Sequence, residues 1–89
     1  MVLKGRWVPF WRGFPVEGPA RPGDYCYVPP GIDHRGNVWY VLDPQGKAGA
    51  IVDHTVTVHE EDNSITCSPS LVMPGGWHGF LEHGVWREV

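Results

Sequence analysis

The apolar and polar positions of this chain alternate in short runs that predict strands separated by turns. The clearest alternation covers residues 54–58 and 64–68, where Thr and Ser occupy every second position. The intervening apolar positions are Val56, Val58, Ile65 and Cys67. A period of two is typical of strands with one buried face. Because residues 60–63 form a charged hairpin tip, we expect the two runs to pair with these four apolar side chains turned inward.

Glycine and proline bound the remaining strand-like runs. These runs lie at residues 24–28, 37–42, 79–82 and 85–88. His83-Gly84 separates the last two runs and predicts a tight hairpin turn with left-handed backbone. Twelve glycines and nine prolines in 89 residues disfavour long helices. The sequence therefore predicts an all-β fold of five or six short strands, arranged as a small single-domain antiparallel sheet or a partly open barrel.

The first 23 residues differ from the rest in being rich in proline, glycine and aromatic residues. Such a segment forms neither a long helix nor a central strand. We expect residues 1–23 to be an extended aromatic arm and residues 24–89 to be the β domain. The arm would cover its own sheet or, as the less favoured alternative, a neighbouring subunit. Its apolar surface and the edge strands of a short chain also predict a homo-oligomer, most simply a dimer.

The charge balance limits the classes of partner. The formal net charge is −3, from seven basic and ten acidic residues. A protein that binds duplex nucleic acid needs clustered Lys and Arg to neutralise phosphates, so we do not expect this partner. The first quarter of the chain nevertheless holds Lys4, Arg6, Arg12 and Arg21. A local anion site is therefore compatible with the sequence.

The apolar runs and the cysteines indicate the compartment. No run approaches membrane-spanning length, and residues 1–3 do not open a signal peptide. We therefore expect no membrane partner and a cytoplasmic location, where thiols stay reduced. Cys26 and Cys67 are accordingly expected to be free and buried.

Several motifs in the last third of the chain resemble one family. The motifs are Ser68-Pro69-Ser70-Leu71, Gly75-Gly76, Trp77-His78-Gly79-Phe80 and Glu82-His83-Gly84-Val85-Trp86, preceded by Arg21-Pro22-Gly23-Asp24-Tyr25. Together they resemble small phage-encoded domains of unknown function. The resemblance implies a viral protein that resides in the cytoplasm of an infected bacterium. It implies no reaction.

A related bacterial branch of this family carries a Cys/His zinc site, but the present chain departs from its pattern. It has no Cys-x-Cys or Cys-x-x-Cys, and only His78 matches a ligand position. Among the five histidines, His54 and His59 would lie on opposite faces of one strand. Cys67 and His78 form the best-placed pair. Because a structural zinc site needs four converging ligands, we expect no metal and no cofactor.

Nucleophilic catalysis could be assembled from Cys67 or Ser70 with His78 and Asp53. Cys67 falls on the inward face of its predicted strand, where a thiol in apolar surroundings is inert. The spacing also lacks a nucleophile elbow. We therefore expect no enzymatic activity, and a small hydrolase is the least supported function.

A binding site is the more attractive hypothesis. Aromatic faces, hydroxyls, open backbone amides and an arginine together suit a nucleotide-like ligand. The predicted ligand-binding residues are Trp77, His78, Ser68, Ser70, Gly75, Gly76, Trp39 and Arg21. The alternative, that most tryptophans form the core, carries slightly more weight. The predicted function is a non-catalytic binding module that sequesters a nucleotide-like signal molecule of anti-phage immunity. A structural or protein-interaction module, with or without a stabilising metal, is the alternative.

Overall fold

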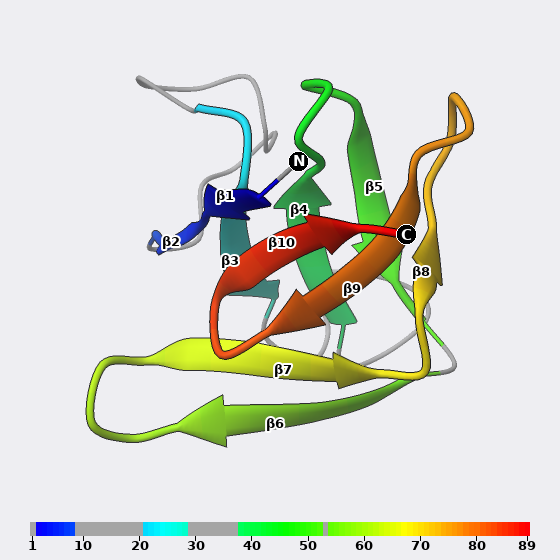
Figure 1. The fold of residues 1–89 in the computed structure, drawn as a ribbon. Helices are drawn as coiled ribbons and strands as arrows, with labels where there is room; N and C mark the ends of the chain where they lie inside the picture. Colours follow the sequence, from blue (N-terminus) through cyan, green and yellow to red (C-terminus); the bar gives the residue numbers. More distant parts are fainter. Residues whose placement is uncertain (1, 9–20, 29–37, 53) are drawn as a thin grey trace.

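The computed structural model describes residues 2–8, 21–28, 38–52 and 54–89. These residues form ten strands and no helix, which confirms the all-β prediction. The strands belong to two four-stranded sheets and one two-stranded ribbon, and none of these closes into a barrel. Figure 1 shows the ribbon of β6 and β7 beneath the other strands.

The C-terminal sheet is antiparallel throughout. Its order is β1 (Val2–Lys4), β10 (Val85–Glu88), β9 (His78–Glu82) and β8 (Leu71–Val72). The central hairpin of β9 and β10 turns at His83 and Gly84, whose φ angles are 50° and 77°. Both residues are therefore in the left-handed region, as the sequence predicted.

The second sheet contains one parallel pair. Its order is β2 (Arg6–Trp7), β3 (Asp24–Val28), β4 (Val38–Leu42) and β5 (Ala48–Ile51). β2 runs parallel to β3, whereas the other neighbours are antiparallel. The sheets are therefore antiparallel, as predicted, except for this one pair at the edge of the second sheet.

The ribbon confirms the predicted pairing of residues 54–58 with residues 64–68. It consists of β6 (Thr55–His59) and β7 (Ser64–Ser68), paired antiparallel. Ile65 and Cys67 are buried and Val56 packs partly against the core, as expected. Val58 is 46% exposed, so its predicted inward position is wrong. The reason is that β7 contacts β9, whereas β6 lies on the outer side of the ribbon.

The number of strands also exceeds the predicted five or six. One additional strand is β5, which lies outside the runs predicted from the sequence. Three further strands, β1, β2 and β8, are only two or three residues long. Such short segments acquire strand geometry by pairing with a neighbour, so their own sequence carries little alternation to reveal them.

The start of the predicted arm belongs to the β domain. β1 lies in the C-terminal sheet and β2 in the second sheet, and Gly5 connects them. The Gly5 N–H donates to the Gly84 carbonyl at 2.7 Å. A Cβ on Gly5 would lie 2.5 Å from the Gly23 carbonyl oxygen, so only glycine fits this crossing. Residues 9–20, the rest of the predicted arm, lie outside the described residues.

Side chains from both sheets and from the ribbon form one core. The two largest, Trp77 and Trp86, meet edge to face with ring centroids 5.4 Å apart. The rest of the buried cluster is Tyr25, Trp39, Val41, Ile51, Ile65, Cys67, Leu71, Met73 and Leu81. Both cysteines are buried and free, as predicted. The core therefore joins segments from all parts of the described chain.

Candidate functional site

A cleft of about 290 Å³ lies where the start of the chain meets the turns of two hairpins. One side is formed by residues 4–7, which cross between the two sheets. The other side belongs to the turn between β6 and β7 and the turn between β9 and β10. The lining residues are Lys4, Gly5, Arg6, Trp7, Tyr25, Asp62, Ser64, His83 and Gly84. We call this the aromatic cleft, after the exposed ring of Trp7.

A second cleft, of about 330 Å³, adjoins the first. Its lining is Leu3, Lys4, Arg6, Arg21, Pro22 and Asp24. Because Lys4 and Arg6 line both clefts, these two side chains stand between them. Three cations and one carboxylate line this second space, which we call the basic cleft. Its lining is thus suited to an anion.

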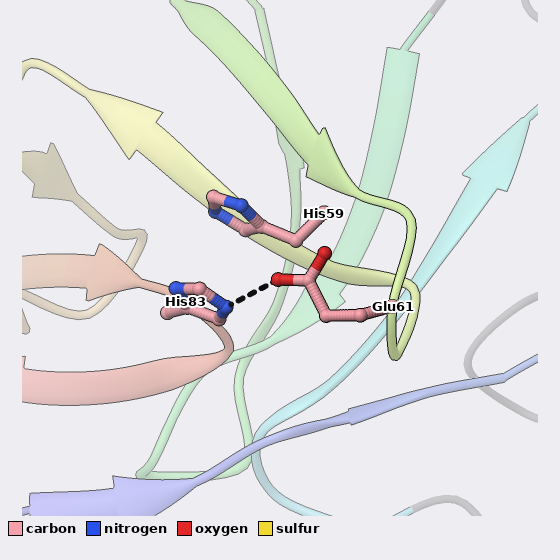
Figure 2. A group of neighbouring side chains, drawn as sticks. All are labelled: His59, Glu61 and His83. Atoms are coloured by element: carbon pink, nitrogen blue, oxygen red, sulfur yellow. Dashed lines mark hydrogen bonds and ion pairs between the residues drawn. The ribbon is translucent and has the colours of Figure 1, made fainter.

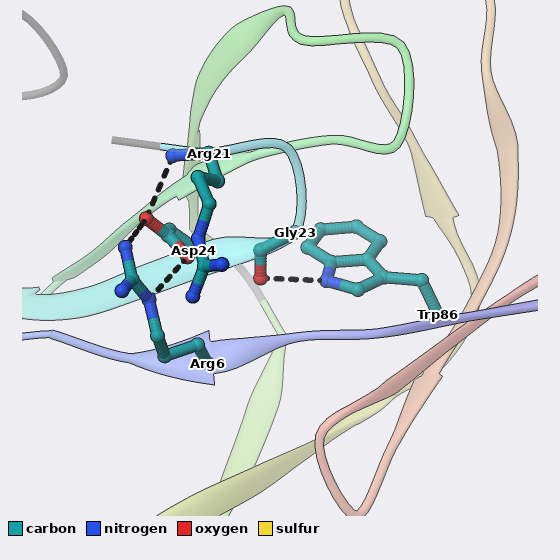
Figure 3. A network of polar contacts seen from close by, with 5 residues as sticks. All are labelled: Arg6, Arg21, Gly23, Asp24 and Trp86. Atoms are coloured by element: carbon teal, nitrogen blue, oxygen red, sulfur yellow. Dashed lines mark hydrogen bonds and ion pairs between the residues drawn. The ribbon is translucent and has the colours of Figure 1, made fainter. Parts of the chain in front are cut away.

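Asp24 fixes the guanidinium of Arg6. Arg6 donates from Nε to Oδ1 at 3.0 Å and from Nη2 to Oδ2 at 2.8 Å. The Asp24 side chain is almost fully buried, and it also accepts the Arg21 backbone N–H at 2.8 Å (Figure 3). Hydrogen bonding to Asp24 raises the pKa of Arg6 above its usual value. Arg6 is therefore a permanently charged group held in one orientation.

Among the described residues that line the aromatic cleft, Trp7 is the large aromatic side chain that is exposed, with 43% of its surface open. Its backbone is held in register with Tyr25 by the parallel pairing of β2 and β3. From the sequence, Trp7 was assigned to an aromatic arm, and Lys4 and Arg6 were named only as cations compatible with a local anion site. The available signal was only that Lys4 and Arg6 are close in sequence, because the two residues lie on strands of different sheets.

The wall of the aromatic cleft opposite Trp7 contains a carboxylate. Asp62 accepts the Ser64 backbone N–H at 3.0 Å. Hydrogen bonding from Ser64, with a smaller effect from the nearby imidazoles of His83 and His59, holds the pKa of the Asp62 carboxyl below its usual value. Asp62 therefore stays charged in mildly acidic solution and can accept hydrogen bonds from a ligand.

A group of potential metal ligands lies next to this wall. His59 and His83 stack with ring centroids 3.8 Å apart and an angle of 4° between the planes. His83 Nε2 lies 3.2 Å from Glu61 Oε1 (Figure 2). One ligand atom from each of the three residues lies within 4.8 Å of the other two. Sequence reasoning missed this group because it considered the histidines only in pairs close in sequence.

The predicted ligand site is only partly assembled. His78 Nε2 lies 3.1 Å from Ser70 Oγ, so these two predicted residues do meet. Gly75 and Gly76 are exposed and have φ angles of 93° and 96°. Ser68 is exposed at the end of β7. This surface therefore offers hydroxyl, imidazole and open backbone.

The predicted stacking surfaces are buried. Trp77 is 2% exposed and Trp39 is 9% exposed, and both belong to the core. Their faces are covered by protein, which supports the alternative that they are core residues. Arg21 lines the basic cleft, whose lining includes none of the other predicted residues. The eight predicted residues are therefore distributed over the core, the surface around Ser70 and His78, and the basic cleft.

The residues considered for catalysis do not form a triad within the described chain. Burial raises the pKa of the Cys67 thiol to about 12, which keeps it protonated and unreactive. Ser70 and His78 form an exposed pair, and no described carboxylate is hydrogen-bonded to His78. Asp53 lies outside the described residues. The described groups therefore lack the third member that would orient the histidine.

The described residues include no helix long and apolar enough to cross a bilayer. Comparison of the chain with known proteins matches no family model, no curated protein and no solved structure.

Proposed function

We infer that this protein is a non-catalytic binding module that holds a small anionic ligand with a flat ring, such as a nucleotide, in the aromatic and basic clefts. The observation that carries this proposal is the combination of one exposed indole with three cations along two adjoining clefts. A nucleotide needs both kinds of group, because its base stacks and its phosphates carry charge. No reactive group is required for sequestration.

The phosphate end of the ligand fits the basic cleft. Arg6 is already fixed by Asp24, so binding loses little side-chain entropy there. Arg21 is exposed and offers a planar fork for two phosphate oxygens. Lys4 adds an exposed point charge between the clefts. The three positive charges of Lys4, Arg6 and Arg21 exceed the one negative charge of Asp24, and the net positive charge of the basic cleft attracts an anion.

The ring of the ligand fits the aromatic cleft. Trp7 presents an exposed indole, on which a base can stack. Asp62 on the opposite wall is exposed and can accept hydrogen bonds from the edge of a base. A stacking contact of this kind is worth about 1–3 kcal/mol. The volume of the cleft, about 290 Å³, is close to that of a small ligand site.

The resemblance of the C-terminal motifs to phage-encoded domains suggests the biological role. Under this proposal the protein is a small phage accessory protein in the cytoplasm of the infected host. It would sequester a nucleotide-like signal molecule of bacterial anti-phage immunity and so lower the concentration of that signal.

Isothermal titration calorimetry with mononucleotides and cyclic dinucleotides tests the proposal. We expect at least one of them to bind the wild-type chain. Trp7→Ala should weaken its binding by about ten- to a hundredfold through loss of stacking. Arg21→Gln should weaken it as well, and should reduce the dependence of affinity on salt.

Lys47→Gln is the matched control. It removes one exposed charge from a different turn, where the Lys47 side chain packs beside Gly75. We expect this variant to bind as the wild type does. If Lys47→Gln weakens binding and Arg21→Gln does not, the ligand lies at the surface of Ser70 and His78 instead. If no nucleotide binds, the proposed function is wrong.

A protein-interaction module is the second candidate, and one observation favours it. Each edge strand of the C-terminal sheet carries an exposed valine, Val2 on β1 and Val72 on β8. An edge strand with an exposed apolar side chain can pair with a second copy of the chain. Sedimentation at micromolar concentration should then show a dimer, and Val72→Lys should give a monomer. A monomeric wild type would contradict this candidate.

A further inference from the structure

The turns of two hairpins bring together side chains that are well separated in the sequence. His59 ends β6, Glu61 lies in the turn between β6 and β7, and His83 lies in the turn between β9 and β10. The two hairpins are held together by backbone hydrogen bonding, since the Gly84 N–H donates to the Ile65 carbonyl at 2.8 Å. The juxtaposition is thus fixed by the fold and does not depend on the side chains themselves.

We propose that His59, Glu61 and His83 bind one divalent transition-metal ion, which joins the turn of the β6–β7 hairpin to the turn of the β9–β10 hairpin. Two imidazoles and one carboxylate are a donor set that suits Zn²⁺, Co²⁺ and Ni²⁺ better than Mg²⁺ or Ca²⁺. With three protein ligands, water completes a four-coordinate site. This site involves none of the cations on which the proposed ligand depends.

The ligand atoms are close enough for one ion to reach all three. They lie within 4.8 Å of one another, and ligands bound to one tetrahedral ion at about 2.0–2.1 Å are separated by less than this. The two rings are stacked, so the two imidazoles lie directly beside each other. Rotation of the His83 imidazole and of the Glu61 carboxylate would direct their ligand atoms to an ion held at His59. The side chains of His83 and Glu61 are more than half exposed, which leaves room for this rotation.

Thr66 contacts the imidazole of His59 and the backbone of His83. Its Oγ1 lies 2.7 Å from His59 Nε2 and accepts the His83 backbone N–H at 2.8 Å. The other ring nitrogen of His59 makes no hydrogen bond within the described residues and is left for a metal. A hydrogen bond at the second nitrogen of a metal-binding histidine fixes the tautomer and the orientation of its ring. Asp62 adds a negative charge near both imidazoles, which favours a cation.

Titration of the tag-free full chain with Co²⁺ alone tests the site, because tetrahedral Co²⁺ with nitrogen and oxygen ligands absorbs visible light. We expect one ion per chain, and Zn²⁺ should displace it. His59→Gln, Glu61→Gln and His83→Asn should each weaken Co²⁺ binding by tenfold or more, as loss of a supporting contact already costs about 10–100-fold. Asn is chosen at position 83 because it tolerates the left-handed backbone of this turn.

His78→Gln is the control, since it removes an exposed histidine from another surface and leaves the three ligands intact. It should bind Co²⁺ as tightly as the wild type. Zn²⁺ should also raise the midpoint of thermal unfolding of the wild type and of His78→Gln, and should have no such effect on His83→Asn. The proposal is overturned if the wild type binds no Co²⁺. It is equally overturned if His83→Asn, shown to be folded by circular dichroism, binds Co²⁺ with unchanged affinity.

Discussion

The indole N–H of Trp86 donates a hydrogen bond to the carbonyl oxygen of Gly23, with 3.0 Å between Nε1 and O, although the two residues are 63 positions apart in sequence (Figure 3). Trp86 lies on β10 of the C-terminal sheet, and Gly23 immediately precedes β3 of the second sheet. The bond is buried and therefore joins the two sheets where water cannot replace either partner. It also holds the segment that carries Arg21 and Asp24 in the basic cleft.

Replacing Trp86 with Phe should destabilise the protein more than replacing Trp77 with Phe. The two rings are equally buried and pack against each other, but Trp77 Nε1 has no hydrogen-bond partner within the described residues. Only the Trp86 variant leaves a buried carbonyl unsatisfied, at a cost of about 1–3 kcal/mol. Urea unfolding of the two variants measures the difference. Equal free energies of unfolding would show that the bond to Gly23 contributes nothing.

Replacing Gly5 with Ala should lower the free energy of unfolding by about 3 kcal/mol, near the upper end for overpacking. The new methyl group would meet the Gly23 carbonyl oxygen at 2.5 Å, and backbone does not move aside as a flexible side chain does. Gly46→Ala is a useful comparison. It has open space around its Cβ, so it should cost only the strain of positive φ, about 1–2 kcal/mol. A Gly5→Ala protein as stable as wild type would mean that β1 and β2 do not cross here.

Stability should fall in alkaline solution. Burial, with a further effect from Asp62, raises the pKa of Tyr25 from 10.0 to about 12, and burial raises the pKa of Cys67 from 9.0 to about 12. Above about pH 9 the unfolded chain loses these protons before the folded protein does. This ionisation lowers the free energy of the unfolded state and therefore reduces the free energy of unfolding. The stabilisation is complete below about pH 9 and is lost as the pH rises towards about 12.

The urea midpoint measured from neutral to alkaline pH checks this expectation. It should decrease steadily above about pH 9 in the wild type. Tyr25→Phe removes one of the two groups, so its midpoint should decrease less steeply. A midpoint that stays constant over the whole range would contradict the burial of both groups.

The two hairpins were predictable because their signals are local. Residues 54–58 and 64–68 alternate on either side of a charged tip, and His83-Gly84 marks a two-residue turn. The pairing of β1 with β10 was not predictable in the same way. It joins Val2 to Arg87, the two ends of the chain, and nothing within the first few residues specifies so distant a partner.

The position of the candidate site could not be predicted either, because its walls are brought together by contacts between segments that are distant in sequence. Trp7 and Trp77 are both flanked by residues that suit turns or edges, yet one is exposed and the other is in the core. The difference arises because Trp77 packs against Trp86 between sheets, whereas Trp7 lies on the edge strand β2. In the same way, His59 and His83 meet only because β7 packs against β9. Residue types alone could suggest a binding module but could not locate its walls.

Native mass spectrometry of the full chain, purified from bacteria in which nucleotide-based immune signalling is active, tests the binding function most directly. We expect the wild-type protein, whose chain mass is 10.0 kDa, to carry additional mass equal to that of a nucleotide. Trp7→Ala and Arg21→Gln proteins prepared in the same way should have lost that mass, while Lys47→Gln should retain it. A wild-type protein that carries no small molecule, or a ligand retained by all three variants, would contradict the account.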